Sequence, residues 1–127
     1  MSTEIKKTSS NFENLKLLTE SCIVNSTLKS IGLRWKMQIL CCFLYEEYQY
    51  GKLKQIFPTI SDQMLSKRLN ELLKEDLIFK VEISGTQPKQ YQYNITEKGK
   101  ELMEIILVLQ QWSRKWAVNG LIVDKLA

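Results

Sequence analysis

Polar side chains recur at helical spacing along one side of the segment 61–75. On a 3.6-residue wheel this side carries Gln63, Ser66, Lys67, Asn70, Glu71 and Lys74. The opposite side carries Leu65, Leu69, Leu72 and Leu73. Glutamine and asparagine amides can pair bidentately with adenine, and lysine can reach guanine or a phosphate. The pattern fits a helix that packs by its leucines and reads duplex DNA by its polar side, although an isolated helix of this kind is more often simply a solvated surface.

The composition removes several kinds of chemistry. The chain has 127 residues and no histidine, which excludes Ser-His-Asp and Cys-His catalysis, histidine-bound zinc or haem, and a histidine pH switch. The length suits one domain. With 18 Lys and Arg against 14 Asp and Glu, the formal charge is +4, which is compatible with nucleic acid but does not prove it.

The three cysteines, Cys22, Cys41 and Cys42, form neither a disulfide framework nor a zinc site, because their number is odd and no Cys-x-x-Cys spacing occurs. Cys41 and Cys42 lie in an apolar helical run and are expected to pack as small hydrophobes.

The polar first residues are unlike a signal peptide, and the longest apolar run, 39–45, is far short of a membrane span. We therefore expect a cytoplasmic protein with reduced thiols, no membrane contact, and no metal or cofactor.

The first third of the chain predicts three helices. Ser10 and Glu13 read as a capping box that starts a short helix, and a second short helix over 25–31 ends at Gly32. A third helix is expected over 34–46, with Trp35, Ile39 and Phe43 on its core side.

The remaining elements follow in a clear order. A short helix over 51–57 ends at Pro58, and Ser61 caps the helix that runs to Glu75. Strands are expected over 77–83 and 90–95, joined by a turn that contains Gly85 and Pro88. Thr96 caps a last helix over 97–117.

This order predicts a fold that is mainly α with a small β-hairpin wing (α+β), the winged helix-turn-helix plan. In that plan helix 61–75 enters the major groove and hairpin 77–95 lies beside it. The residues expected to read base edges are Gln63, Ser66, Lys67 and Asn70. The residues expected at phosphates or in wing contacts are Arg34, Lys36, Tyr50, Lys52, Ser61, Arg68, Lys80 and Lys89.

The chain from Cys22 to Trp112 resembles the HxlR-type transcriptional regulators, a branch near the MarR regulators. The matching stretches are 22–28 (CIVNSTL), 31–36 (IGLRWK), 50–53 (YGKL), 57–58 (FP), 60–65 (ISDQML), 69–72 (LNEL), 76–78 (DLI) and 93–99 (YNITEKG), followed by Trp112. The sequence departs from the family pattern at Ile23, where the family usually has proline, and at Asp76, where it usually has glycine.

The resemblance implies a homodimer built by the terminal helices. Three regions follow: an extension and dimerisation helix over 1–21, the DNA-binding domain over 22–96, and a dimerisation helix with a tail over 97–127. The expected interface residues are Leu15, Leu18, Leu102, Ile105, Ile106, Leu109, Trp112 and Trp116. The alternative for the last helix is an ordinary intramolecular core, but its apolar surface near 105–109 is broader than one core-facing side needs.

The resemblance also makes Cys22 a candidate sensor of oxidants or electrophiles. Its position just before the expected helix 25–31 would favour a thiolate, whereas burial would make it inert. A small-molecule effector remains open, as does a pocket lined by Trp35, Tyr45 and Trp112, although these aromatics also suit the core.

We therefore expect a dimeric repressor, not an enzyme, that binds a pseudo-palindromic operator with half-sites roughly 10 base pairs or a multiple apart. Two alternatives stay open. One is a winged-helix module that binds protein instead of DNA. The other is a thiol-dependent redox enzyme, which no paired cysteines, glycine-rich loop or carboxylate cluster supports.

Overall fold

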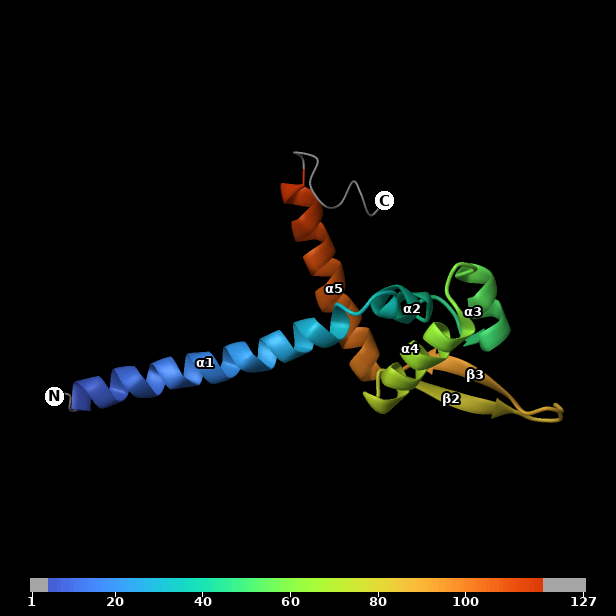
Figure 1. Ribbon diagram of the computed structural model, residues 1–127, viewed down its shortest axis with the longest axis horizontal. Coiled ribbons are helices and arrows are strands. Elements are labelled where there is room, and N and C mark those ends of the chain that lie inside the picture. Colours follow the sequence, from blue (N-terminus) through green and yellow to red (C-terminus); the bar gives the residue numbers. More distant parts are fainter. Residues whose placement is uncertain (1–4, 118–127) are drawn as a thin grey trace. The chain divides into compact units, whose positions relative to one another are not determined.

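The computed structural model describes residues 5–117, and it describes side chains from residue 11 onward except at residues 18 and 19. The backbone forms two compact units that divide between Met37 and Gln38, and each unit is described by itself. Both units are drawn in Figure 1. The tail 121–127 and the side chain of Leu18 lie outside the described residues.

The first unit consists mainly of one long helix, α1 (Ile5–Ile31). The prediction of two short helices was wrong, because no glycine or proline interrupts 5–31 and Ser10 lies inside the helix. The predicted stop at Gly32 is confirmed: the Gly32 N–H donates to the Leu28 carbonyl at 2.9 Å just beyond the last turn.

Helix α2 (Lys36–Cys42) is shorter than the predicted helix over 34–46. Trp35 has a φ of 75°, a left-handed conformation that no α-helix accommodates, so the helix begins only after it. At the other end the Phe43 N–H bonds the Leu40 carbonyl at 3.1 Å, a tightened i→i−3 turn that closes the helix. Ile39 and Phe43 are buried as predicted, Leu40 is buried with them, and Trp35 is only half-buried.

Three antiparallel strands form a small sheet in the order β1-β3-β2. They are β1 (Tyr48–Gln49), β2 (Ile78–Ile83) and β3 (Gln90–Ile95). The predicted hairpin is confirmed, with Ile78 opposite Ile95 and Ile83 opposite Gln90. Strand β1, where the sequence predicted only an extended link, pairs Tyr48 with Tyr93. The Phe43 ring lies 6.0 Å from the Tyr48 ring and 6.4 Å from the Tyr93 ring.

Two helices precede the hairpin, α3 (Tyr50–Ile56) and α4 (Asp62–Lys74), and both match their predictions closely. The Met64 N–H donates to Ser61 Oγ at 3.1 Å, which confirms the predicted cap. Leu53, Ile60, Leu65, Leu69 and Leu72 are buried. In Figure 1, α4 lies alongside the β2–β3 hairpin, whose tip extends beyond α3 and α4.

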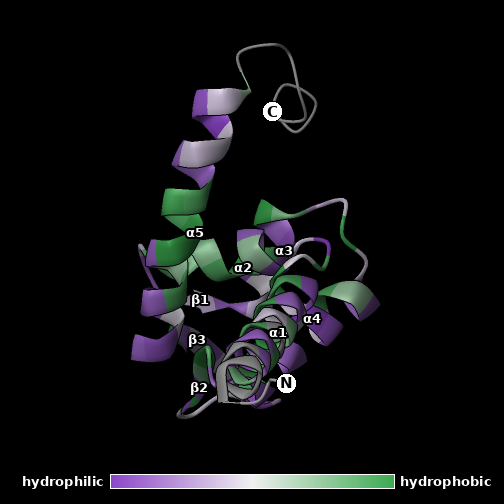
Figure 2. Cartoon of the chain, turned by 90° about the vertical axis from the view of Figure 1, so that its left-hand side faces the viewer, coloured by the Kyte–Doolittle hydropathy of each residue, from purple (hydrophilic) through white to green (hydrophobic). Residues whose placement is uncertain are grey.

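The last helix, α5 (Glu97–Trp116), begins at the predicted cap. Thr96 Oγ1 accepts from the Gly99 N–H at 3.0 Å and donates to the Asp76 carbonyl at 2.7 Å, which joins the end of α4 to the start of α5. Within α5 the buried residues are Gly99 and Met103. Figure 2 shows hydrophobic residues in the middle turns of this helix and hydrophilic residues toward both ends. None of the helices over 5–117 is long and apolar enough to cross a membrane.

Candidate nucleic-acid interface

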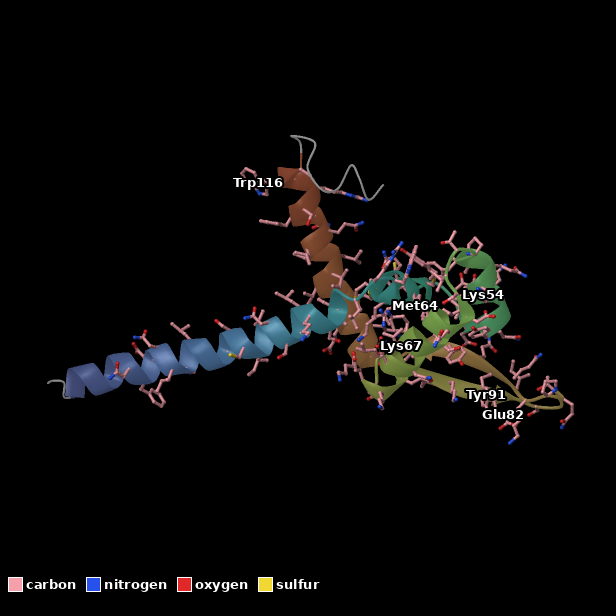
Figure 3. All side chains as sticks on the ribbon, viewed as in Figure 1. Lys54, Met64, Lys67, Glu82, Tyr91 and Trp116 are labelled. Carbon is pink, nitrogen blue, oxygen red and sulfur yellow. The ribbon has the colours of Figure 1, made fainter. Side chains whose placement is uncertain are left out.

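The outward side of α4 is exposed along its length. Gln63, Ser66, Lys67 and Asn70 are all exposed, while Leu65, Leu69 and Leu72 on the opposite side are buried. The four polar residues line an open surface hollow together with Glu71, Leu73 and Lys74. Lys67 is labelled on α4 in Figure 3. All four residues predicted to read bases therefore share one accessible surface.

A group of polar contacts holds the beginning of α4 against α3. The Tyr50 hydroxyl lies 3.1 Å from the Asp62 carbonyl and 3.3 Å from Asp62 Oδ1, and it accepts from Ser66 Oγ at 3.5 Å. Lys54 Nζ donates to the Ile60 carbonyl at 2.5 Å and lies 3.4 Å from Asp62 Oδ1. Tyr50 and Lys54 are four residues apart and thus share one side of α3. Sequence reasoning missed Lys54 and Asp62, although this spacing was a usable signal.

Two residues predicted to contact phosphates are buried instead. Arg68 is 6% exposed, and its Nη1 bonds both carboxylate oxygens of Glu71 at 3.0 and 3.1 Å. Lys36 is fully buried and donates from Nζ to Ser30 Oγ at 2.8 Å. A helical wheel places such a residue only to within a flank of its helix, so the burial of these two side chains was not predictable from it. Neither is available to DNA in this conformation.

The other predicted phosphate and wing residues are accessible to differing degrees. Arg34, Lys52, Ser61, Lys80 and Lys89 are exposed, and Tyr50 is half-buried. The Arg34 guanidinium lies 5.1 Å from the centre of the Trp35 ring, and Lys80 Nζ lies 4.4 Å from the centre of the Tyr91 ring. Figure 3 labels Tyr91 and Glu82 on the hairpin. Lys89 lies in the turn between β2 and β3.

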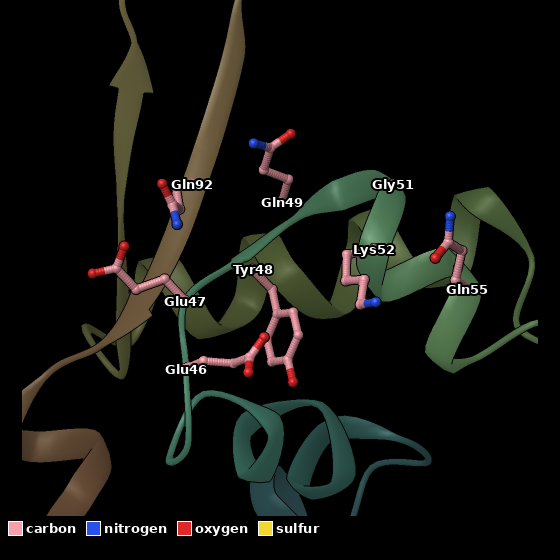
Figure 4. A pocket seen from close by; sticks show the side chains of 8 residues that line it. All are labelled: Glu46, Glu47, Tyr48, Gln49, Gly51, Lys52, Gln55 and Gln92. Carbon is pink, nitrogen blue, oxygen red and sulfur yellow. The ribbon is translucent and has the colours of Figure 1, made fainter.

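A second hollow lies beside β1 and has a different chemistry. Its lining residues are Glu46, Glu47, Tyr48, Gln49, Gly51, Lys52, Gln55 and Gln92. Figure 4 shows Lys52 and Gln55 projecting from α3, with Glu46 and Glu47 on the segment that leads into β1 and Tyr48 on β1 itself. Asn94 Nδ2 donates to Glu47 Oε2 at 3.0 Å. The pKa of Tyr48 is raised by lost hydration and then by the negative charge of Glu46. Two carboxylates make this hollow a poor surface for phosphates.

The cysteines differ in their surroundings. Cys22 is exposed, but it lies well inside α1, so the predicted stabilisation by a helix start was wrong. Cys41 and Cys42 are half-buried, as expected for packing residues, and Cys42 Sγ donates to the Gln38 carbonyl at 3.5 Å. Burial, followed by the neighbouring Cys41, raises the pKa of Cys42. Over residues 5–117, no group of three Cys, Asp or Glu side chains could hold a metal ion.

The residues predicted to form a dimer interface are largely exposed in the single chain. Leu15, Ile105, Leu109, Trp112 and Trp116 are exposed, and Leu102 and Ile106 are half-buried. The aromatic residues proposed for a ligand pocket are not clustered in the core, since Tyr45 is 81% exposed and Trp112 is 61% exposed. An ordinary intramolecular core therefore accounts only for the buried residues of α5, Gly99 and Met103.

Comparison with known proteins gives one consistent answer. The profile of the HxlR-like helix-turn-helix family matches residues 30–120. The regulatory protein MalR of Fusobacterium mortiferum is 37% identical over 95 residues, which span 74% of this chain and 89% of MalR.

Two solved structures of regulators also resemble the chain. The reduced form of the transcriptional regulator YodB from B. subtilis matches with a TM-score of 0.68 and 25% identity, covering 76% of this chain and 93% of that one. The redox regulator HypR in its oxidised form matches with a TM-score of 0.64 and 26% identity, covering 74% and 96%. The protein is therefore a helix-turn-helix transcriptional regulator and not an enzyme, and it belongs to the HxlR-like family.

Proposed function

We propose that this protein is a homodimeric repressor that binds a pseudo-palindromic operator, with α4 in the major groove and the β2–β3 hairpin as a wing. The observation that carries the proposal is the exposed polar side of α4, which Ser61 caps and three buried leucines anchor. A helix that is fixed on one side and free on the other can enter the groove without disturbing the core.

The proposed base contacts come from Gln63, Ser66, Lys67 and Asn70, which line the same hollow. The amides of Gln63 and Asn70 suit adenine, and Lys67 suits guanine. Ser66 can bond either kind of base edge, and its hydroxyl already lies 3.5 Å from Tyr50 Oη. Discrimination at each base is expected to be worth about 1–3 kcal/mol.

The proposed phosphate and wing contacts are Arg34, Tyr50, Lys52, Ser61, Lys80 and Lys89. Lys36 and Arg68 are withdrawn from this set, since both are buried. The cations of the hairpin, Lys80 and Lys89, lie on the element expected to meet the backbone or the minor groove beside the reading helix. Each phosphate contact adds about one unit to the slope of log affinity against log salt concentration.

Exposed apolar residues on the terminal helices support the homodimer. On α1 these include Phe12, Leu15 and Ile23, and on α5 they include Ile105 and Trp112. Large apolar side chains that stay exposed along a helix mark interaction sites in soluble proteins. A twofold partner is the commonest way to cover it, and it also supplies the second reading helix that a palindromic site needs.

The test is footprinting of the purified full-length protein on the promoter regions beside its own gene. We expect protection of two half-sites about 10 base pairs, or a multiple of that, apart. The substitution Lys67→Ala should weaken the specific site by about 1–3 kcal/mol if Lys67 reads a base. If it contacts a phosphate, all sequences weaken alike and the salt slope falls by about one. A protein that binds no duplex even at low salt would instead support the protein-binding alternative.

We also propose that modification of Cys22 by an oxidant or electrophile weakens operator binding. The support is its exposure on α1, a helix assigned here to the dimer, and the likeness to YodB and to HypR, which is named a redox regulator. The experiment titrates DNA with wild type and with Cys22→Ser, each with and without diamide. Loss of affinity confined to wild type supports the proposal, and an equal response in the variant rejects it.

A further inference from the structure

The carboxylate of Asp62 stands at the first residue of the proposed reading helix and is both exposed and held in place. Its side chain is 78% exposed. Its Oδ1 atom nevertheless has two neighbours from α3, Tyr50 Oη at 3.3 Å and Lys54 Nζ at 3.4 Å. An exposed aspartate on a helix start normally samples several rotamers, so this pair of contacts restricts an otherwise free group.

The two neighbours are themselves fixed. Lys54 is only 29% exposed and donates to the carbonyl of Ile60, a residue that is 3% exposed in the turn between α3 and α4. The Tyr50 hydroxyl also bonds the Asp62 carbonyl at 3.1 Å. The side chain of Asp62 is thus tied to the same contacts that hold the two helices together. Such support is what keeps a recognition group within the narrow geometry that it needs.

Both contacts use Oδ1, while the side chain as a whole stays largely exposed. A carboxylate oxygen is only an acceptor, so in the major groove it can bond the exocyclic amine of cytosine N4 or adenine N6 but no base carbonyl. The negative charge of the carboxylate also repels phosphates. A docking that brings Asp62 to the DNA backbone is therefore disfavoured relative to one that brings it to a base amine. The nearby Lys54 ammonium moderates that repulsion.

We propose that Asp62 is a specificity-determining residue that accepts a hydrogen bond from an exocyclic base amine, and that Tyr50 and Lys54 are positioning residues for it. The inference rests on the proposed docking of α4, because the first turn of a recognition helix is the part that meets base edges. It also changes the proposed role of Tyr50 from a phosphate contact to a residue that positions the Asp62 carboxylate.

The experiment pairs protein and DNA changes. A duplex that wild type selects from a randomised library is compared with the same duplex carrying purine for adenine, or 2-pyrimidinone for cytosine, at each position in turn. Wild type should lose about tenfold in affinity at one position of each half-site when the amine is removed. Asp62→Ala should lose less than about twofold from that same edit.

Two further variants keep the result interpretable. Asp62→Asn retains an oxygen that can accept from Tyr50, and it replaces the other oxygen by an NH2 donor. The preference at that position should therefore change from a base with an exocyclic amine to guanine or thymine, whose carbonyls accept hydrogen bonds. Tyr50→Phe should flatten the preference at that position, and it should also lower the thermal midpoint by a few degrees, because the contact with the Asp62 carbonyl is lost. Asp76→Asn is the matched control, since it removes the same charge at the opposite end of α4 and should leave every base preference unchanged.

The outcomes separate the two proposals. If wild type binds no duplex in a salt-dependent way, the docking of α4 itself fails. If wild type binds with a clear base preference, and Asp62→Ala and Asp62→Asn keep that preference at every position, the docking stands and the role of Asp62 is rejected.

Discussion

Asp76 adopts a conformation that its side chain does not favour. Its φ is 61°, and it stands just after α4 in a helix-ending motif: the Leu77 N–H bonds the Leu72 carbonyl at 2.9 Å, and the Asp76 N–H bonds the Leu73 carbonyl at 3.1 Å. This is the position where the resembling family usually has glycine. The departure therefore has a physical cost, since a left-handed residue with a Cβ is strained by about 1–2 kcal/mol.

The substitution Asp76→Gly should raise the free energy of unfolding by up to about 1 kcal/mol, because relief of strain exceeds the extra chain entropy of glycine in the unfolded state. Urea denaturation at 25 °C measures the change. Lys74→Gly, inside the helix, is the matched control and should destabilise by about 0.5–1 kcal/mol. Equal destabilisation by both substitutions would contradict the assignment of strain to Asp76.

The thiols should react in an order set by exposure. Cys22 is exposed, whereas Cys42 is half-buried and burial raises its pKa, so fewer Cys42 thiols are ionised near pH 8. We expect iodoacetamide to label Cys22 before Cys42 in the native protein, as followed by mass spectrometry of peptides at timed intervals. In denaturant the difference should vanish. Faster labelling of Cys42 in the native protein would contradict the described packing.

Gly99 makes the close contact between α5 and the sheet. A Cβ built there would lie 2.3 Å from the Leu77 carbonyl oxygen and 2.6 Å from Ile95 Cγ1. The backbone oxygen cannot swing away, so Gly99→Ala must displace α5 from the start of β2 and the end of β3. We expect a loss of about 1–3 kcal/mol in the free energy of unfolding. Gly51→Ala, with no atom within 4 Å of its added Cβ, is the control and should not destabilise the protein, because alanine is more favourable than glycine inside a helix such as α3.

The elements of the second unit were predictable where local signals agreed. Ser61 and Thr96 supply helix caps, Pro58 ends α3, and β-rich segments flank the turn at Gly85, so each boundary had its own chemical cause. The exposed polar side of α4 followed from a leucine pattern of helical period. These features depend on neighbours in sequence, which is why they could be read without coordinates.

Other features depend on contacts that no local pattern encodes. The left-handed Trp35 shortens α2, and residues 5–31 form one helix because nothing in them stops it, although a capping box at Ser10 looked like a start. The sequence predicted Lys36 and Arg68 as surface cations. In the structure both are buried, and Lys36 donates to Ser30 while Arg68 donates to Glu71. The spacing of Tyr50 and Lys54 places both on one side of α3, but only the turn between α3 and α4 brings them to Asp62.

At the scale of the whole molecule, the apolar surface of α5 requires an explanation that one chain does not supply. Ile105, Val108, Leu109 and Trp112 are all exposed, although a helix of a monomer would turn such residues toward its own core. Burial of one tryptophan alone removes roughly 150–250 Å² from water. The homodimer proposed above uses this surface and couples it to DNA binding, since one chain can engage only one half-site.

The substitution Trp112→Glu should therefore convert the dimer to a monomer, because it places a charge where an apolar contact is expected. Analytical ultracentrifugation measures the assembly, and a titration with whole and half operators measures binding. We expect affinity for the whole site to fall by about 10²-fold or more, as the second binding event ceases to be intramolecular, while affinity for an isolated half-site stays unchanged. Gln110→Glu adds the same charge about half a turn away and should remain dimeric. A Trp112→Glu protein that stays dimeric and keeps its affinity for the whole site would show that α5 does not hold the two reading helices together.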